Sequence, residues 1–307
     1  MSRIARFVRN DQPTVYHVIS RSALPGLPIK AGDKDYLLSL IRRLSTLYVV
    51  DVLGFALMDN HFHLVVRVYP ESDVSDRELN QRYKEYYGQD QIIAGEMLDH
   101  YRKRLTSLGS FVKDIKQGFT RYYNKKYNRQ GYFWGGRFKS LIVQDGRTLV
   151  NLLAYVDLNP IRAEVVKRPE DYRWCSLGYH VQTRNKGELL SVDFGMKEWQ
   201  EFNSKEIIRK YREFVYETGA VDVGKGATID QNIVNTERKR KYRIRRVDRF
   251  INRTRYFTDA GIIGSKEFVG EVFDQVKFLL GSKDERRFTP VGGVEDLYSM
   301  KRLGAKY

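Results

Sequence analysis

The N-terminal part of the chain shows strand-like and helix-like patterns of apolar positions in turn. Residues 14–21 (TVYHVISR) alternate between apolar and polar side chains, which predicts a strand. Residues 33–48 repeat leucine and isoleucine at the spacing of one helical face. Residues 49–57 and 61–69 are rich in β-formers and are separated by a short MDN segment. The pattern therefore predicts a strand, a helix and a β-hairpin in that order.

The middle of the chain extends this pattern. Residues 102–126 predict a long basic helix, and residues 131–143 (GYFWGGRFKSLIV) predict a loop followed by a strand. Residues 147–158 carry a helical apolar stripe that stops at Asn159-Pro160. The order of these elements predicts an α+β fold, an antiparallel sheet with helices packed on one face.

The chain changes character after about residue 184. Helices are predicted at 197–218, 229–256 and 265–281, so we expect residues 1–184 to form one domain and 185–307 a basic, mainly helical region. Within it, residues 237–256 contain ten Lys or Arg and two acidic residues. Such a run is either a solvated helix face or a surface for nucleic acid, and the mutual repulsion of its charges favours nucleic acid.

Charge and composition narrow the class of partner. The 307 residues include 54 Lys and Arg against 38 Asp and Glu, a formal net charge of +16, which is typical of proteins that bind nucleic acid. No run approaches the roughly 18 apolar residues of a membrane-spanning helix, and the N-terminus has no apolar signal segment. We therefore expect a cytoplasmic protein with no membrane partner. The single cysteine, Cys175, excludes a disulfide framework.

Two of the five histidines lie one residue apart, in the stretch MDNHFHLVV. Residues i and i+2 of a strand project to the same face, so His61 and His63 would lie side by side with Phe62 pointing into the core. Two adjacent neutral imidazoles can bind one divalent metal ion. An isolated pair of this kind is more often two unrelated strand histidines, so other residues have to support a metal site.

That support comes from the stretch LLAYVDLNPIRA. Tyr155 and Asn159 are spaced i, i+4 on a predicted helix and so share one face. The Asn159 amide oxygen is a plausible third ligand for a hard cation such as Mg²⁺ or Mn²⁺. The Tyr155 phenol could then act as a nucleophile on a phosphate polarised by the metal. The alternative is a packing tyrosine followed by an ordinary Asn-Pro helix end.

Five ordered segments give the chain a resemblance to a known family. They are YHVISR at 16–21, MDNHFHLVV at 58–66, the basic stretch 115–140, AYVDLNPIRAEVV at 154–166 and PEDYRWCS at 169–176. As a set they resemble the HUH-type single-tyrosine transposases, and most closely their REP-associated branch. The family turn is usually Pro-Asn-His-x-His, whereas this chain has Asp59 in place of the proline. Over the final 120 residues, only GIIGSKEFV at 261–269 matches, to an extended subgroup.

The resemblance implies a fold, a reaction and a set of roles. It implies a ferredoxin-like HUH catalytic domain in which His61 and His63 bind the metal, Asn159 is the third ligand and Tyr155 is the nucleophile. It implies cleavage of single-stranded DNA beside a hairpin, through a 5′-phosphotyrosine intermediate that leaves a 3′-OH. It also implies a prokaryotic protein that works at the nucleoid as a monomer or a homodimer, with Mg²⁺ or Mn²⁺ as cofactor.

Basic side chains in the predicted helix, the loop and the C-terminal run are expected to contact DNA phosphates. They are Lys113, Lys116, Arg121, Lys125, Lys126, Arg137, Lys139, Arg162, Arg240, Arg243 and Arg246. Nearby aromatic residues could stack on unpaired bases or pack in the core. They are Tyr122, Tyr123, Phe133 and Trp134.

Two other functions stay open on sequence grounds. The protein could be a catalytically silent regulator that binds DNA hairpins. It could also be a metal-dependent nuclease or RNA-processing enzyme that uses His61 and His63 without a covalent step. Trapping a covalent protein–DNA adduct separates these functions from the transposase.

Overall fold

The computed structural model describes residues 8–9, 11–222, 224, 226–244, 260–267, 270–271, 274, 289–290 and 298–301. These residues fall into two units. The first comprises residues up to 180 together with 184–243, and the second comprises 181–183 together with residues from 244 onward. The described strands of the second unit form an antiparallel sheet in the order β5-β7-β6, with bounds β5 Ala260–Gly264, β6 Thr289–Pro290 and β7 Tyr298–Lys301.

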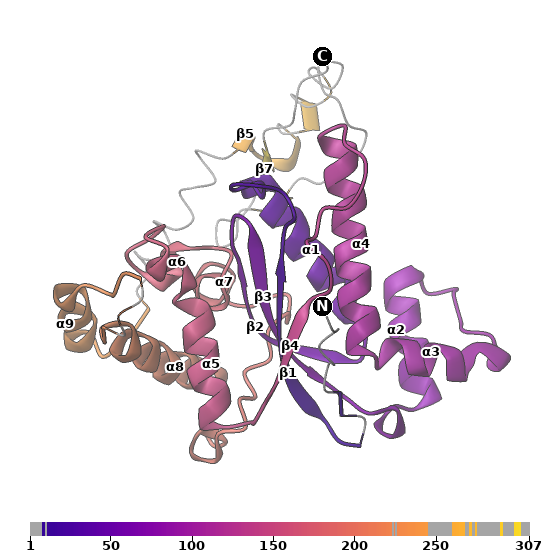
Figure 1. Ribbon diagram of the computed structural model, residues 1–307, viewed down its shortest axis with the longest axis horizontal. Coiled ribbons are helices and arrows are strands. Elements are labelled where there is room, and N and C mark those ends of the chain that lie inside the picture. The colour runs from indigo at the N-terminus through magenta and orange to yellow at the C-terminus, as the bar shows by residue number, and fades with distance from the viewer. Residues whose placement is uncertain are drawn as a thin grey trace. The chain divides into compact units, whose positions relative to one another are not determined.

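Four antiparallel strands form the sheet of the first unit, in the order β2-β3-β1-β4 (Figure 1). They are β1 Thr14–Arg21, β2 Val50–Leu57, β3 His61–Val68 and β4 Lys139–Val143. The described helices are α1 Ala31–Leu47, α2 Asp76–Tyr87, α3 Leu98–Leu105, α4 Leu108–Lys126, α5 Arg147–Asp157, α6 Asn159–Arg162, α7 Ser176–Thr183, α8 Ser204–Gly219 and α9 Gln231–Lys239. Short 3₁₀ turns cover Glu71–Asp73, Gly95–Met97, Pro169–Asp171 and Lys197–Trp199. The α+β class and the antiparallel sheet are confirmed.

Helices α1 and α4 cover one face of this sheet (Figure 1). Alternate strand residues such as Tyr16, Val18 and Leu64 point toward these helices and form one buried apolar cluster with them. Phe111 and Phe119 of α4 are fully buried in the same cluster. This layer is the main hydrophobic core of the unit, because it joins both long helices to three strands.

Helix α5 covers the opposite face, so the prediction of helices on one face only is wrong (Figure 1). α5 lies against β2, where Leu153 occupies the space beside Gly54. Strand β3 is buried along almost its whole length, as expected for a strand covered on both faces. The order of strands along the chain does not reveal which face a later helix covers, so the face covered by α5 could not be predicted from it.

Residues 184–243 pack with the first unit, so the predicted domain boundary at 184/185 differs from the observed division. The Ser191 amide donates to the Val52 carbonyl at 2.8 Å. On α8, the Tyr211 hydroxyl donates to Asp157 of α5 at 2.5 Å. These contacts bury helix α8 against α5, and a change of composition along the chain does not show them.

The helix ends also differ from the sequence pattern where local capping intervenes. The predicted helix 102–126 is divided into α3 and α4, because the Ser107 hydroxyl accepts from the Ser110 amide and caps α4. Within the predicted helix 229–256, α9 ends at Lys239 and is followed by Lys241 and Tyr242 with positive φ. Residues 245–256 of that prediction lie outside the described residues. Most of the predicted helix 265–281 lies outside the described residues. Across the described residues, every helix is too short or too polar to span a bilayer.

Replacing Gly54 by alanine tests the packing of α5 on the sheet. A Cβ atom at Gly54 would lie 2.4 Å from Leu153 Cδ2 and 3.0 Å from Ser176 Oγ, so the Leu153 side chain or α5 would have to shift. Glycine to alanine in a strand normally adds about 0.5–1 kcal/mol of stability, but here we expect a loss of about 1–3 kcal/mol from overpacking. Urea unfolding measures the difference. Gly95→Ala, where a Cβ meets nothing within 4 Å, is the matched control, and equal stability of the two variants would contradict the packing.

Candidate active site

The two histidines of the HFH stretch lie at the start of β3. Their ring centroids are 5.0 Å apart, and both rings project to the sheet face that carries α5. His63 is buried with 3% exposure, while His61 is half-buried. The turn before them is anchored by the Ile29 amide, which donates to the Asp59 carbonyl at 2.8 Å. The imidazole pair therefore has a rigid backbone beneath it.

Asp59, where the family has proline, is neutralised by a buried lysine. The Lys34 ammonium donates to Asp59 Oδ1 at 2.6 Å and to the Tyr172 hydroxyl at 3.1 Å. It also lies 4.2 Å from the Trp174 ring centroid, a cation–π contact. The carboxylate thus serves to fix the turn, and its charge raises the pKa of His61 by less than burial lowers it.

The hydrogen bond of His61 determines which ring nitrogen can bind a metal. Its Nδ1 lies 2.7 Å from the Asn60 amide oxygen. An amide oxygen only accepts, so Nδ1 carries the proton in the neutral ring and Nε2 keeps its lone pair. His61 therefore offers Nε2 as a ligand atom.

A third histidine, His17 of β1, completes the cluster and was missed by the sequence reasoning. Its Nε2 lies 2.9 Å from His63 Nδ1, and the two ring planes are 15° apart. His17 pairs with Val65 across the β1–β3 ladder, two residues along each strand from the pair between Ile19 and His63. His17 and His63 are therefore diagonal neighbours on the same face of the sheet. The available signal was the histidine in TVYHVISR, but the contact depends on the register of two strands.

Burial keeps all three imidazoles neutral. It lowers the pKa of His17 and of His61 to about 4 and that of His63 to about 3, and the nearby Arg21 charge contributes at His61 and His63. A neutral imidazole is the form that binds metal ions. The rings of His61 and His63 can therefore bind a metal ion at neutral pH without first losing a proton.

Tyr155 of α5 lies beside these rings. Its ring centroid is 5.9 Å from that of His63 and 6.4 Å from that of His17. The tyrosine side chain is 40% exposed, although it sits between the buried Ala154 and Val156. The structure thus places the predicted nucleophile beside His63, a predicted metal ligand that lies about 90 residues away in the chain.

Arg162 and Asn159 follow Tyr155 along the chain. The Arg162 guanidinium lies 4.9 Å from the Tyr155 ring centroid, so this predicted DNA contact is placed at the predicted nucleophile. The Asn159 amide nitrogen donates to the Tyr155 carbonyl at 2.8 Å. That bond uses the nitrogen, so the amide oxygen is the atom that could serve a metal. Asn159 begins α6 instead of lying within α5.

Oxygen ligands would have to complete any metal site here. Among the residues that the structure describes, no group of three His, Cys, Asp or Glu side chains is placed to hold a metal ion. Mg²⁺ and Mn²⁺ favour oxygen ligands, which the Asn159 amide and a substrate phosphate could supply. The two imidazoles, neutral and adjacent, fit a site of this composition.

The other predicted DNA contacts are spread over several surfaces. Lys113, Arg121 and Lys125 are exposed on α4, which covers the sheet face opposite the histidines. Lys139 pairs with Ile19, which also pairs with His63, so the exposed Lys139 shares the face of the imidazoles. Contacts with DNA near Tyr155 would therefore come from β4 rather than from α4.

Several of these cations have partners within the chain. Lys126 is bound to the fully buried Asp33 at 2.5 Å, the Lys116 ammonium donates to the Gly136 carbonyl, and Arg240 pairs with Glu237 at 3.3 Å. Arg243 is exposed, and Arg246 lies outside the described residues. Lys126 and Lys116 therefore stabilise the fold through these bonds in addition to contributing positive charge to the surface.

The aromatic residues considered for base stacking are mostly core residues. Tyr123, Phe133 and Trp134 are buried in the apolar cluster. Tyr122 is partly buried, stacks on Tyr36 at 3.7 Å between centroids and donates to Asp33 at 3.2 Å. Packing is therefore the role that the structure gives them. Cys175 is also fully buried, as expected.

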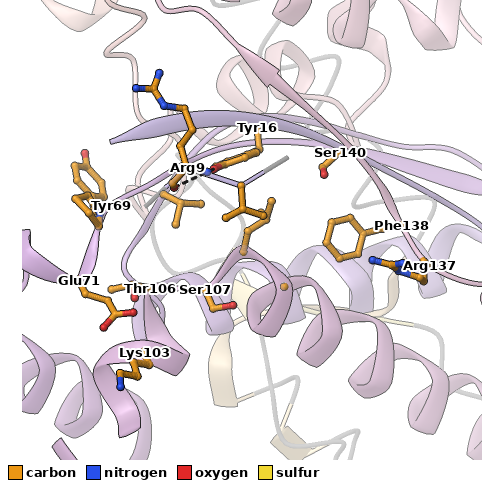
Figure 2. Close-up of a pocket in the computed structure, with 15 residues that line it drawn as sticks. Arg9, Tyr16, Tyr69, Glu71, Lys103, Thr106, Ser107, Arg137, Phe138 and Ser140 are labelled. Atoms are coloured by element: carbon orange, nitrogen blue, oxygen red, sulfur yellow. Dashed lines mark hydrogen bonds between the residues drawn. The ribbon is translucent and has the colours of Figure 1, made fainter. Parts of the chain in front are cut away.

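Arg137 lines a pocket of about 410 Å³ (Figure 2), and His17, His61 and His63 are not among the residues that line it. Arg9 and Lys103 also line it, together with Tyr16 and Phe138. Tyr16 projects to the sheet face of α1 and α4, and it lies toward the end of the sheet away from His61. Arg137 therefore lines a pocket that also contains Tyr16, a residue of the core layer.

Comparisons with known proteins give matches among solved structures only. No protein-family model matches the chain, and no curated protein matches it either. A REP-associated tyrosine transposase bound to a REP hairpin is 13% identical, with 63% of this chain and 90% of that chain covered and a TM-score of 0.42. A candidate transposase from Deinococcus radiodurans is 15% identical, with 51% and 96% covered and a TM-score of 0.29.

The buried imidazoles make stability depend on pH. An unfolded histidine has a pKa near 6.5, so below that pH the unfolded chain takes up protons that the folded His63, with its pKa near 3, does not. Stability is full above pH 6.5 and falls as the pH drops, by on the order of 2 kcal/mol per buried histidine at pH 5. Urea unfolding in EDTA at pH 7 and pH 5 should show a smaller loss for His63→Gln than for the wild type. The exposed His100→Gln should keep the wild-type loss, and an equal loss in both variants would contradict this assignment.

Proposed function

We propose that this protein cleaves and rejoins single-stranded DNA through a covalent bond between the Tyr155 oxygen and a DNA 5′-phosphate. One arrangement carries the proposal: the exposed Tyr155 ring lies 5.9 Å from the His63 ring, with the Arg162 guanidinium 4.9 Å from its centroid. The resemblance of the HFH and AYVDLNP stretches to the HUH-type transposases supports the same roles.

The proposed reaction exchanges one phosphoester bond for another. The Tyr155 oxygen bonds to phosphorus, the bond from phosphorus to the 3′ oxygen breaks, the phenol gives up its proton and the 3′ oxygen takes one up. Because the phosphoester is conserved, a 3′-OH can later attack the phosphotyrosine and restore the DNA backbone without a further energy source. The chemistry therefore suits strand transfer better than hydrolysis.

Arg162 stabilises the charge that develops in this step. Negative charge grows on the phenol oxygen and on the phosphate, and a fixed guanidinium beside both lowers the barrier. A guanidinium can also bind two phosphate oxygens at once, which orients the phosphate for attack. This role explains why the arginine lies on the nucleophile rather than on the outer surface of the unit.

His61 and His63 would hold Mg²⁺ or Mn²⁺, with the Asn159 amide oxygen as a third ligand. When bound there, such an ion polarises the scissile phosphate and neutralises part of its charge. The tautomer of His61 and the lowered pKa of both rings support ligation through neutral nitrogens. The turn anchored through Asp59 and Lys34 keeps the two rings in place before any ligand arrives.

The substrate we propose is single-stranded DNA flanked by a hairpin. The net charge of +16 favours a polyanion, and Lys139 adds a cation on the face of the site. The hairpin is proposed from the family resemblance. It would mark the cleavage position, while the unpaired strand enters the site.

Tyr155→Phe tests the nucleophile. The ring is kept and one exposed oxygen is lost, so the fold should survive at a cost of about 1 kcal/mol or less. Covalent adducts with single-stranded genomic fragments in Mg²⁺ or Mn²⁺, seen on denaturing gels, should disappear together with cleavage. Hairpin binding, measured by gel shift, should persist because basic surfaces provide it.

Tyr132→Phe is the matched control, because this tyrosine is 77% exposed and lies in the loop before β4. It should form adducts at the wild-type rate. An adduct that persists in Tyr155→Phe would move the nucleophile to another tyrosine. Cleavage by the wild type without any adduct would instead indicate a nuclease, and hairpin binding without cleavage would indicate a regulator.

The variants His61→Ala and His63→Ala test the metal site. Cleavage should be abolished in both, while hairpin binding stays within about threefold of the wild type. His100→Ala, on α3, should cleave normally. Normal cleavage by the double alanine variant of His61 and His63, with a native circular dichroism spectrum, would rule out their role as ligands.

A further inference from the structure

The contact between His17 and His63 is not used by the proposed reaction and needs its own explanation. The two rings are joined by a 2.9 Å contact between His17 Nε2 and His63 Nδ1. Both side chains are at least 95% buried. Across the ladders, His17 faces Val65 of β3 and Leu141 of β4, two apolar residues. In the described part of the chain, His63 is therefore the hydrogen-bond partner of the His17 ring.

Two neutral imidazoles can make such a bond in only two ways, because one nitrogen must donate and the other accept. If His63 Nδ1 donates, His63 Nε2 keeps its lone pair and can bind a metal. If His17 Nε2 donates, His63 carries its own proton on Nε2 and cannot. The direction of one hydrogen bond thus decides whether His63 is a ligand.

We propose that His17 is a positioning residue that accepts the hydrogen bond from His63 Nδ1–H and so holds the His63 Nε2 lone pair toward the metal position. The inference rests on the metal site of the proposed function. It is supported by the matching arrangement at His61, whose Nδ1–H donates to Asn60 and leaves Nε2 free. His61 and His63 then each donate their Nδ1–H to an acceptor and keep the Nε2 lone pair for the metal. Proteins commonly orient histidine ligands by such a hydrogen bond.

The assignment also explains the position of His17 relative to the site. A third ligand would have to direct its own lone pair to the metal, but His17 Nε2 is engaged with His63 at 2.9 Å. The ring is nearly parallel to that of His63, at 15°, and so prevents rotation of that ring. Burial holds the pair in place, because the sheet and α5 enclose both rings.

A matched pair of substitutions at His17 separates this role from simple packing. His17→Gln keeps an acceptor oxygen near the position of Nε2, whereas His17→Leu fills the space without one. Titration of the full-length protein with Mn²⁺, followed by the electron paramagnetic resonance of free Mn²⁺, gives the affinity without DNA. We expect His17→Leu to bind Mn²⁺ about 10–100-fold more weakly, as for other residues that orient ligands, and His17→Gln within about threefold of the wild type.

A second measurement needs no metal. Nitrogen-15 NMR of the histidine rings reports which nitrogen carries the proton. We expect the Nδ1–H form for His63 in the wild type and in His17→Gln, and a shift toward the Nε2–H form in His17→Leu. If His17→Leu does not fold, the wild-type tautomer and the affinity of His17→Gln still decide the matter.

Three outcomes bear on the inference and on the proposed function separately. Equal Mn²⁺ affinity in folded His17→Leu and wild type, or an Nε2–H tautomer in the wild type, overturns the role of His17 alone. Absence of Mn²⁺ binding that depends on His61 in the wild type overturns the metal site itself, and the role of His17 with it. His180→Gln, at a second buried histidine on α7, should leave both readouts unchanged.

Discussion

The close approach of α5 to the sheet at Gly54 is the constraint on which the candidate site depends. Because residue 54 has no side chain, Leu153 can lie directly over β2, beside a bulge between Val52 and Gly54. Tyr155 follows Leu153 by two residues, so the same contact sets how far the phenol stands from the imidazoles. A side chain at residue 54 would collide with Leu153, and relief of that collision by a shift of α5 would move Tyr155 away from the imidazoles.

Buried polar groups fix the C-terminal end of α5, beyond the contact between Leu153 and Gly54. Asp157 accepts from the Tyr211 hydroxyl and from the Leu177 amide, and burial raises the pKa of its carboxyl to about 6. Residues two apart on a helix point in very different directions, so the burial of Asp157 keeps Tyr155 turned toward solvent. Arg212 of α8 adds a buried ion pair with Glu170 at 2.5 Å. Removing one partner of such a pair typically costs about 3–5 kcal/mol, so this contact ties α8 firmly to the unit that carries the candidate site.

Local patterns predicted the elements of this fold, whereas contacts between distant elements had to come from the structure. The strand with His61 and His63 was predicted from a local run of β-forming residues, and the helix with Tyr155 from an apolar stripe with the helical period. The contact between His17 and His63 depends on strand register, and the bond from Lys126 to Asp33 joins residues 93 positions apart. No local period encodes such contacts. The loop aromatics were ambiguous for the same reason, since burial of Phe133 depends on where the loop lies.

The basic residues fall into two groups. Some can attract a polyanion such as DNA to the protein, and others lie near Tyr155, where they could act on a bound phosphate. The exposed cations of α4 stand behind the sheet, on the face away from Tyr155, and salt screens exposed charges beyond about 10 Å at ordinary ionic strength. They can raise the local concentration of DNA, but they do not reach the phosphate that Tyr155 would attack. Near the phenol, the structure places Arg162 on the ring and Lys139 on the same sheet face. If Tyr155 attacks a phosphate, the positions of these two cations would matter more there than the net charge of the chain.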